Sequence, residues 1–183
     1  LVNPIAVNSG TSALHLALLA LDIKKRDEVI TVPNSFISIA LSIHHVGAKP
    51  VFVDIDPKTY NIDTKKVKEK ITDKTKAIIP VHNYGNPCNI EELTEIAKDF
   101  NLKLIEDASH APGSLFKGRK IGSFGEIFYT HYDEIENKFD KCAKVIKSSK
   151  PLFEIKFKDS SVYSSLNEML VTASKFARDK GLR

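Results

Sequence analysis

Residues 104–113, read as LIEDASHAPG, carry the side chains best suited to chemistry. An apolar run ends there in two acids, and small residues and His110 follow at once. In an α/β protein this pattern is typical of the carboxyl end of a parallel strand, where ligands usually bind. Asp107 would need a partner there, because an unpaired buried charge is costly. The protonated ring nitrogen of a cofactor would be such a partner; alternatively, Asp107 caps the next turn.

A second candidate is the turn NSGTS at residues 8–12, which opens a leucine-rich helix predicted over residues 11–21. Gly10, Thr11 and Ser12 would present backbone N–H groups and two hydroxyls at a helix start, which suits a phosphate. The alternative is an ordinary cap formed by Thr11 or Ser12. Phe36, in the first turn of a helix predicted over residues 35–46, could cover the face of a flat ring or belong to the core.

The elements that must position these residues alternate along the chain. The pattern predicts strands over residues 1–7, 28–32, 50–55, 75–81 and 102–106, and helices over residues 11–21, 35–46, 62–71 and 90–100. Strands that alternate with helices in this way form a parallel sheet. The nearly continuous apolar character of residues 50–55 predicts a strand in a sheet that is covered on both faces. We therefore expect an α/β fold with three layers, α/β/α, around a mostly parallel sheet.

The pattern changes after Gly113. Residues 115–121 predict a hairpin with its turn at Lys117 and Gly118, and residues 127–129 would rejoin the sheet. Further on, the sequence predicts a helix over 132–148, a strand over 152–158 and a helix over 160–180. We expect a large domain over residues 1–130 and a divergent α+β segment over residues 131–183.

Composition restricts the function classes. The 183 residues carry a formal net charge of +4, too small an excess to indicate nucleic acid binding. The two cysteines, Cys88 and Cys142, lie far apart, form no metal-ligand pattern and fit a reducing cytoplasm. No apolar run approaches the length of a membrane span. We expect a cytoplasmic globular protein without a metal.

Five segments occur in a specific order. They read VNSGTSALHLAL, VPNSFIS, GAKPVFVDIDPKTYNID, IIPVHNYGNPCNIEEL and LIEDASHAPGSLFKGRKIGSFGEI. In order and spacing, across roughly residues 2–127, they resemble the DegT/DnrJ/EryC1/StrS family of sugar aminotransferases. These are pyridoxal-phosphate enzymes of the aspartate aminotransferase fold type. The resemblance implies pyridoxal 5'-phosphate as cofactor, a nucleotide-linked keto-sugar as substrate, an amino acid as amine donor and a homodimer.

The resemblance also implies roles for individual residues. Asp107 would pair with the pyridinium nitrogen and keep the ring cationic, so that it can accept electrons. Phe36 would stack on the ring, and His110 would lie beside its phenolic oxygen. Thr11 and Ser12, with the backbone at Gly10, would hold the cofactor phosphate. His82 and Tyr84 would support the pocket.

The chain departs from the family pattern after residue 127. Glu136 stands where the family has the lysine that bonds to the cofactor, and a carboxylate cannot form that bond. Lys138 could replace this lysine only in a shifted register, so the catalytic residue is unassigned. His131 stands where a phosphate-binding serine is expected.

Three hypotheses follow: an aminotransferase, a catalytically inactive family member, or a keto-deoxysugar dehydratase. The dehydratase would need a histidine at the lysine position, and His131 comes several residues too early. Because the family has an N-terminal arm and a longer C-terminal domain, we expect a truncated or rearranged product, or an excerpt of a longer chain.

Overall fold

The computed structural model describes residues 3–7, 9–131 and 153–157. Within these residues, seven strands form one sheet in the order β1-β9-β8-β5-β4-β2-β3. In chain order the strands are β1 (Asn3–Val7), β2 (Glu28–Thr31), β3 (Lys49–Phe52), β4 (Thr75–Ile78), β5 (Lys103–Asp107), β8 (Ile127–His131) and β9 (Phe153–Phe157). β3, β2, β4, β5 and β8 run parallel to one another, and β9 is antiparallel to both of its neighbours. β1 therefore runs in the same direction as β5.

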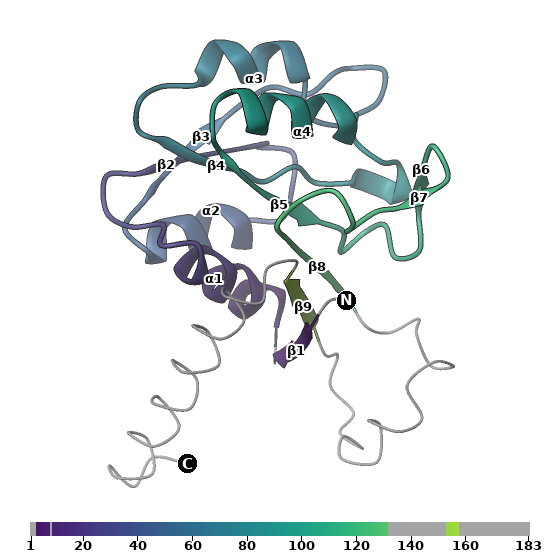
Figure 1. Ribbon diagram of the computed structural model, residues 1–183, viewed down its shortest axis with the longest axis horizontal. Coiled ribbons are helices and arrows are strands. Elements are labelled where there is room, and N and C mark those ends of the chain that lie inside the picture. The colour runs from purple at the N-terminus through teal and green to yellow at the C-terminus, as the bar shows by residue number, and fades with distance from the viewer. Residues whose placement is uncertain (1–2, 8, 132–152, 158–183) are drawn as a thin grey trace, which may run out of the picture.

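The helices cover both faces of this sheet. α1 (Gly10–Ala20) and α2 (Ser38–His45) lie on one face, and α3 (Thr64–Lys70) and α4 (Ile90–Asp99) lie on the other, as Figure 1 shows. This arrangement confirms the expected three-layer α/β/α fold with a mostly parallel sheet.

Local sequence explains where the helices begin. Ser9 caps α1, because its side chain accepts a hydrogen bond from the backbone N–H of Ser12. The prediction of Thr11 or Ser12 as the cap was wrong by two or three residues. In α4, Glu91 and Glu92 stand in the first turn, where acids interact favourably with the helix dipole.

The hydrophobic core lies between these layers. α1 contributes Ala13, Leu14, Ala17 and Leu18, and α4 contributes Ile90, Leu93 and Ile96. β2 is buried along its whole length because β3 and β4 flank it. β3 is at the edge of the sheet, and Phe52 at its end is 46% exposed. The sheet as a whole is covered on both faces, as the apolar character of residues 50–55 predicted, although this edge strand is only partly buried.

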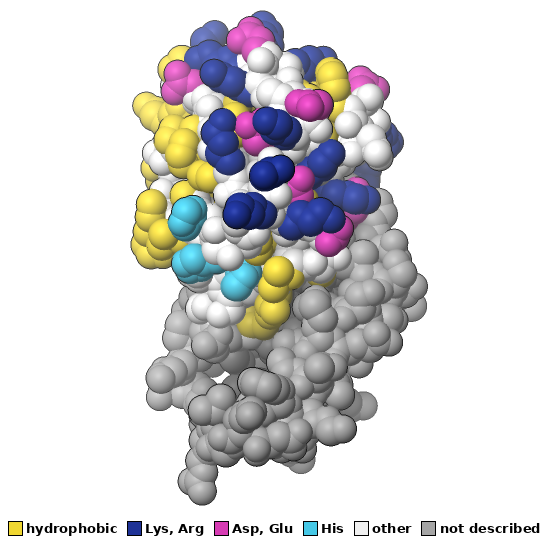
Figure 2. Space-filling view, turned by 90° about the vertical axis from the view of Figure 1, so that its left-hand side faces the viewer, with side chains coloured by type: hydrophobic (Ala, Val, Ile, Leu, Met, Phe, Trp, Pro, Cys, Tyr) yellow, Lys and Arg dark blue, Asp and Glu magenta, His cyan; other side chains and the backbone are white. Residues whose placement is uncertain are grey.

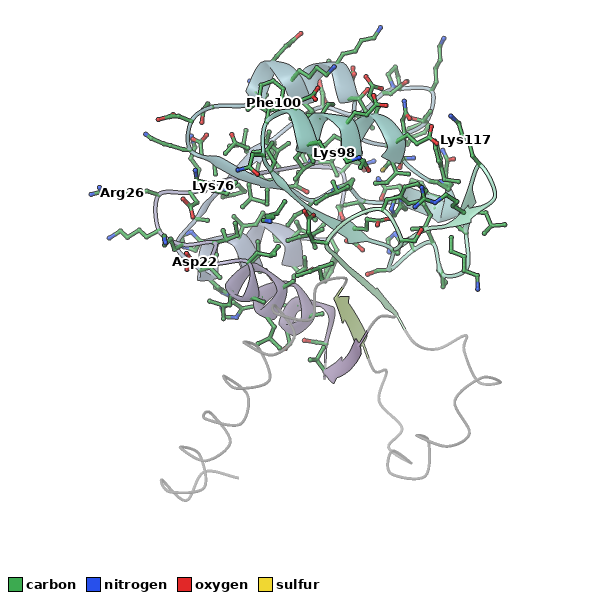
Figure 3. The ribbon with its side chains drawn as sticks, viewed as in Figure 1. Asp22, Arg26, Lys76, Lys98, Phe100 and Lys117 are labelled. Carbon is green, nitrogen blue, oxygen red and sulfur yellow. The ribbon has the colours of Figure 1, made fainter. Side chains whose placement is uncertain are left out.

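The predicted hairpin is confirmed. β6 (Leu115–Phe116) pairs with β7 (Arg119–Lys120) in an antiparallel ladder. Lys117 and Gly118 form the turn with φ of 48° and 80°, a left-handed conformation that glycine adopts without strain. Lys117 projects from the tip, as Figure 3 shows, and pairs with Glu91 of α4. This ion pair ties the hairpin to α4.

The strand predicted over residues 152–158 is confirmed as β9, which lies in the main sheet between β1 and β8. The helices predicted over residues 132–148 and 160–180 lie outside the described residues. In the part of the chain that the structure describes, no helix is long and apolar enough to cross a membrane. Figure 2 shows that the basic side chains on one face have acidic side chains among them.

Candidate functional site

The candidate site residues belong to one edge of the sheet. Asp107 ends β5, and the turn before α1 follows the end of β1, which runs in the same direction. Asp107 is paired with Tyr129 of β8, and Tyr129 is paired with Ile155 of β9. Ile155 is in turn paired with Ile5 of β1. The carboxyl ends of β1 and β5 therefore meet the same edge, as the strand pattern predicted.

Asp107 and Glu106 point to opposite faces of the sheet, because successive side chains in a strand alternate. Glu106 contacts backbone near α4 and the segment that follows β7, whereas Asp107 points to the face that α1 covers. Asp107 is only 5% exposed. Its Oδ1 accepts a hydrogen bond from the backbone N–H of Ser109 at 3.0 Å, so it also caps the following turn.

The start of α1 is organised by two serines. The Ser9 hydroxyl accepts the Ser12 backbone N–H at 3.1 Å and donates to the Ser12 hydroxyl at 2.9 Å. The N–H groups of Gly10 and Thr11 belong to the first turn, where the helix itself offers no carbonyl partner. The Ser42 hydroxyl of α2 donates to the Thr11 carbonyl at 3.2 Å, which fixes this helix start against α2.

Phe36 lies before α2 and not in its first turn. The helix begins at Ser38, three residues later than predicted, because residues 33–35 after β2 form bends. Phe36 is 72% exposed, so the alternative that it belongs to the core is wrong.

The loops that follow β2, β3 and β4 are tied together by Asn83, which is buried. Its side-chain amide donates to the carbonyl of Asn34 at 3.4 Å and to that of Tyr60 at 3.1 Å. Its backbone N–H donates to Oδ1 of Asn61 at 3.1 Å. Next to it, Tyr84 adopts a φ of 56° and is 76% exposed. Asn83 thus fixes the backbone of three loops at the carboxyl edge.

The loop after β4 also meets the loop after β5. The Ser114 hydroxyl donates to the carbonyl of Gly85 at 3.0 Å. A Cβ atom at Gly85 would lie 3.8 Å from the carbonyl oxygen of His110. His110 itself is exposed at this edge.

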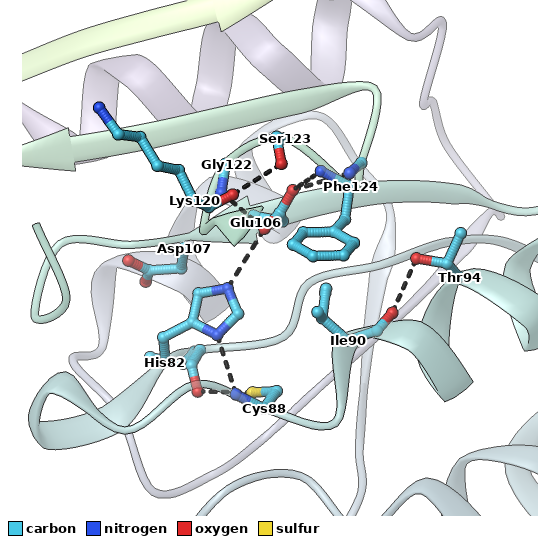
Figure 4. Close-up of polar contacts among 12 residues, drawn as sticks. His82, Cys88, Ile90, Thr94, Glu106, Asp107, Lys120, Gly122, Ser123 and Phe124 are labelled. Atoms are coloured by element: carbon cyan, nitrogen blue, oxygen red, sulfur yellow. Dashed lines mark hydrogen bonds and ion pairs between the residues drawn. The ribbon is translucent and has the colours of Figure 1, made fainter. Parts of the chain in front are cut away.

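Behind Asp107, Glu106 is fully buried and surrounded by donors, as Figure 4 shows. Its Oε1 accepts the N–H groups of Phe124 at 2.9 Å and Gly125 at 2.7 Å, and its Oε2 accepts that of Gly122 at 2.8 Å. Nε2 of His82 faces Oε2 at 3.5 Å, and within the described residues this buried nitrogen has no hydrogen-bond partner.

His82 joins this cluster to the rest of the edge. Its Nδ1 accepts the backbone N–H of Cys88 at 3.0 Å, so the ring proton is on Nε2 and faces Glu106. Its own backbone N–H donates to the carbonyl of Asp107 at 3.0 Å. His82 therefore contacts both acids, one through its ring and the other through its main chain.

Electrostatics in this cluster follow from burial and from donors. Burial alone would raise the pKa of Glu106, but the His82 ring and the N–H groups of Gly125 and Gly122 outweigh it and hold the pKa below its ordinary value. Cys88 is different, because burial raises the pKa of its thiol to about 12. Its Sγ donates to the carbonyl of Val81 at 3.1 Å, which marks it as a structural thiol.

Sequence reasoning did not assign a role to Glu106. The available signal was the pair of glycines at 122 and 125, since closely spaced glycines often bring backbone N–H groups against another segment. Lys138 and Glu136 lie outside the described residues, and of His131 only the backbone is described, as the last residue of β8. A cavity of about 540 Å³ lies at the other end of β5, between α4 and residues 123–126, and no candidate residue lines it.

Comparisons with known proteins agree with this architecture. The sequence profile of the DegT/DnrJ/EryC1/StrS aminotransferase family matches residues 2–131. GDP-perosamine synthase of Escherichia coli O157:H7 is 49% identical over 121 residues, which are 66% of this chain and 33% of that protein. The dTDP-3-amino-3,6-dideoxy-alpha-D-galactopyranose transaminase of Aneurinibacillus thermoaerophilus is 48% identical over 122 residues, 67% of this chain and 34% of that protein.

Solved structures extend the likeness. The aminotransferase from Psychrobacter cryohalolentis superposes with a TM-score of 0.78 at 36% identity, over 89% of this chain and 39% of that chain. NtdA from Bacillus subtilis, solved with bound cofactor PMP, gives a TM-score of 0.73 at 32% identity, over 87% of this chain and 34% of that chain. The chain spans about a third of the length of the curated relatives it matches. By its ordered segments, its sheet and this profile, the chain belongs to the DegT/DnrJ/EryC1/StrS aminotransferase family.

Proposed function

We propose that this chain forms the cofactor-binding part of a pyridoxal-phosphate-dependent aminotransferase that acts on a nucleotide-linked keto-sugar. The observation that carries the proposal is the position of Asp107. Asp107 is buried at the end of β5, and the alternation of side chains along the strand turns its carboxylate toward the face that α1 covers. A buried carboxylate at the carboxyl edge is suited to a cationic ring nitrogen.

The chemistry of the residues present suits this cofactor. Asp107 would pair with the ring nitrogen, and Gly10, Thr11 and Ser12 would bind the phosphate through backbone N–H groups and hydroxyls. Phe36, which is exposed, would stack on the ring, and His110 would lie at its polar edge. When bound, the cofactor supplies an electron sink for the amino acid carbanion. Pairing with Asp107 would keep its ring protonated.

The substrate class is supported by the names of the relatives. GDP-perosamine synthase and the dTDP-linked sugar transaminase both carry a nucleotide-sugar in their names. We extend this class to the present chain, with an amino acid as the amine donor. We also propose a homodimer in the cytoplasm; sedimentation of the purified chain tests the dimer.

Titration of the purified full chain with pyridoxal 5'-phosphate tests the proposal. We expect saturable binding, seen as a shift of the cofactor absorbance, that Asp107→Ala abolishes. Absence of binding by the wild-type chain would refute the proposal.

Reduction with borohydride then distinguishes the catalytic alternatives. A cofactor fixed to a lysine, which peptide mapping would locate at Lys138 or elsewhere, supports an aminotransferase. Saturable binding without fixation assigns the chain to the inactive members of the family. Release of a dehydrated sugar without amine transfer would instead indicate the dehydratase.

A further inference from the structure

Glu106 is a buried acid to which the proposed reaction gives no role. Glu106 is 0% exposed and lies next to Asp107 in β5. Its side chain therefore points to the rear face of the sheet, opposite to the front face to which Asp107 points. Taking a carboxylate out of water is costly unless hydrogen bonds compensate. An acid at this position therefore needs a physical reason.

The donors around Glu106 supply that reason. Three backbone N–H groups donate to its two oxygens, and Nε2 of His82 faces Oε2 at 3.5 Å without a hydrogen bond. A carboxylate suits these three donors, because it has two acceptor oxygens and no proton of its own. A glutamine would place an NH₂ group among these donors.

The same cluster fixes the end of β5. The carbonyl of Asp107 accepts the N–H of His82 at 3.0 Å, and the N–H of Asp107 donates to the carbonyl of Pro80 at 3.0 Å. His82 is in turn fixed by its ring, between the Cys88 N–H and Glu106. Any movement of Glu106 would therefore shift the backbone of Asp107 in two ways. One is the peptide bond that joins the two residues, and the other is His82, whose backbone N–H donates to the Asp107 carbonyl.

We propose that Glu106 is a positioning residue for the cofactor site: it anchors, from the rear face, the strand end whose front face presents Asp107. This inference rests on the proposed function for its ligand. Its structural part, the anchoring of Asp107, does not depend on any ligand.

The test compares Glu106→Gln with Glu126→Gln in the purified full chain. Glu126 is a matched control, because its carboxylate also accepts a β5 backbone N–H, that of Leu104 at 2.7 Å, yet lies at the other end of the strand. Three quantities are measured: urea stability, amide exchange at residues 107–111 without cofactor, and the dissociation constant for pyridoxal 5'-phosphate.

We expect Glu106→Gln to accelerate exchange at residues 107–111 and to weaken cofactor binding, each by about tenfold or more, since hydrogen bonds to a buried charge are lost. Glu126→Gln should leave cofactor binding within about twofold, whatever its effect on stability. Glu106→Asp, which keeps the charge, should recover part of the affinity, and it replaces the glutamine variant if that variant does not fold.

Two results would overturn the proposal. One is unchanged exchange and affinity in Glu106→Gln or, where only Glu106→Asp folds, in that variant. The other is an equal loss of affinity in both glutamine variants, which would reduce Glu106 to a general contributor to stability. If the wild-type chain binds no cofactor, the proposed function fails, and the exchange at residues 107–111 still decides whether Glu106 anchors Asp107.

Discussion

Replacement of Gly125 by alanine tests the packing behind the site most directly. A Cβ at this position would lie 2.4 Å from the carbonyl oxygen of Leu104 and 3.1 Å from its carbonyl carbon. Ordinary contacts of this kind begin at 3.4 Å, so the two segments would have to separate by about 1 Å (3.4 − 2.4). Both atoms belong to the backbone, which cannot rotate away as a flexible side chain would.

The separation would stretch three hydrogen bonds. The Gly125 N–H to Glu106 is 2.7 Å long, the Glu126 N–H to the Leu104 carbonyl 3.0 Å, and the Leu104 N–H to the Glu126 carboxylate 2.7 Å. Overpacking costs about 1–3 kcal/mol, and loss of a hydrogen bond to a charged group about 1.5–3 kcal/mol. We expect Gly125→Ala to lower the free energy of unfolding by about 3–5 kcal/mol, a large part of the roughly 5–15 kcal/mol of a typical domain.

Urea unfolding of the full chain, followed by far-UV circular dichroism, measures this loss. Gly113→Ala is the matched control, because Gly113 has a φ of +77° but, among the described residues other than its chain neighbours, no atom lies within 4 Å of the added Cβ. It should cost only the left-handed backbone penalty, about 1 kcal/mol. If Gly125→Ala costs no more than Gly113→Ala, the close approach of Gly125 to Leu104 is wrong.

Three further predictions concern the site and its surroundings. Cys88, whose thiol pKa is about 12, should resist alkylation in native buffer and react in urea, as peptide mapping by mass spectrometry would show; rapid native labelling would contradict its burial. Asp107→Asn should leave the circular dichroism spectrum unchanged and weaken pyridoxal 5'-phosphate binding by about tenfold or more, measured by fluorescence titration, because the charge is lost while the acceptor for the Ser109 N–H remains. The pKa of Glu106 lies below its ordinary value of 4.5, so its ionised form stabilises the fold fully above pH 4.5, and this contribution is lost as the pH falls through the lowered pKa. The stability difference between wild type and Glu106→Gln should therefore shrink in acid titrations below pH 4.5; a constant difference would show that the charge does not matter.

The alternation of strands and helices was enough to predict the layers and the place of Asp107, and the turn residues Lys117 and Gly118 were enough to predict the hairpin. These features depend on local signals, namely apolar runs, turn residues and short sequence separation. The position of β9 could not be predicted in the same way. Its pairing with Asn3–Val7 joins segments about 150 positions apart, and nothing in the FEIKF pattern specifies the neighbouring strands.

Errors in the predicted site share a physical cause. Phe36 was placed in a helix because its neighbours are apolar, whereas the chain bends at residues 33–35 before α2 begins. The role of Glu106 was missed because its partners are backbone N–H groups 16 to 19 positions later, which no side-chain pattern records. Side-chain types indicate what a site can bind, but backbone donors are located only by the fold.

Gly125 and Glu106 depend on each other. Because Gly125 packs directly against the Leu104 carbonyl, the backbone of residues 122–125 is pressed against β5 and its N–H groups point at the strand. Those N–H groups are removed from water and need an acceptor. An apolar residue at position 106 would leave them unpaired, at a cost of about 1–3 kcal/mol for each. Glu106 therefore supplies the acceptor that the close approach of residues 122–125 needs, and together with Gly125 it holds the end of β5 that carries Asp107 on its other face.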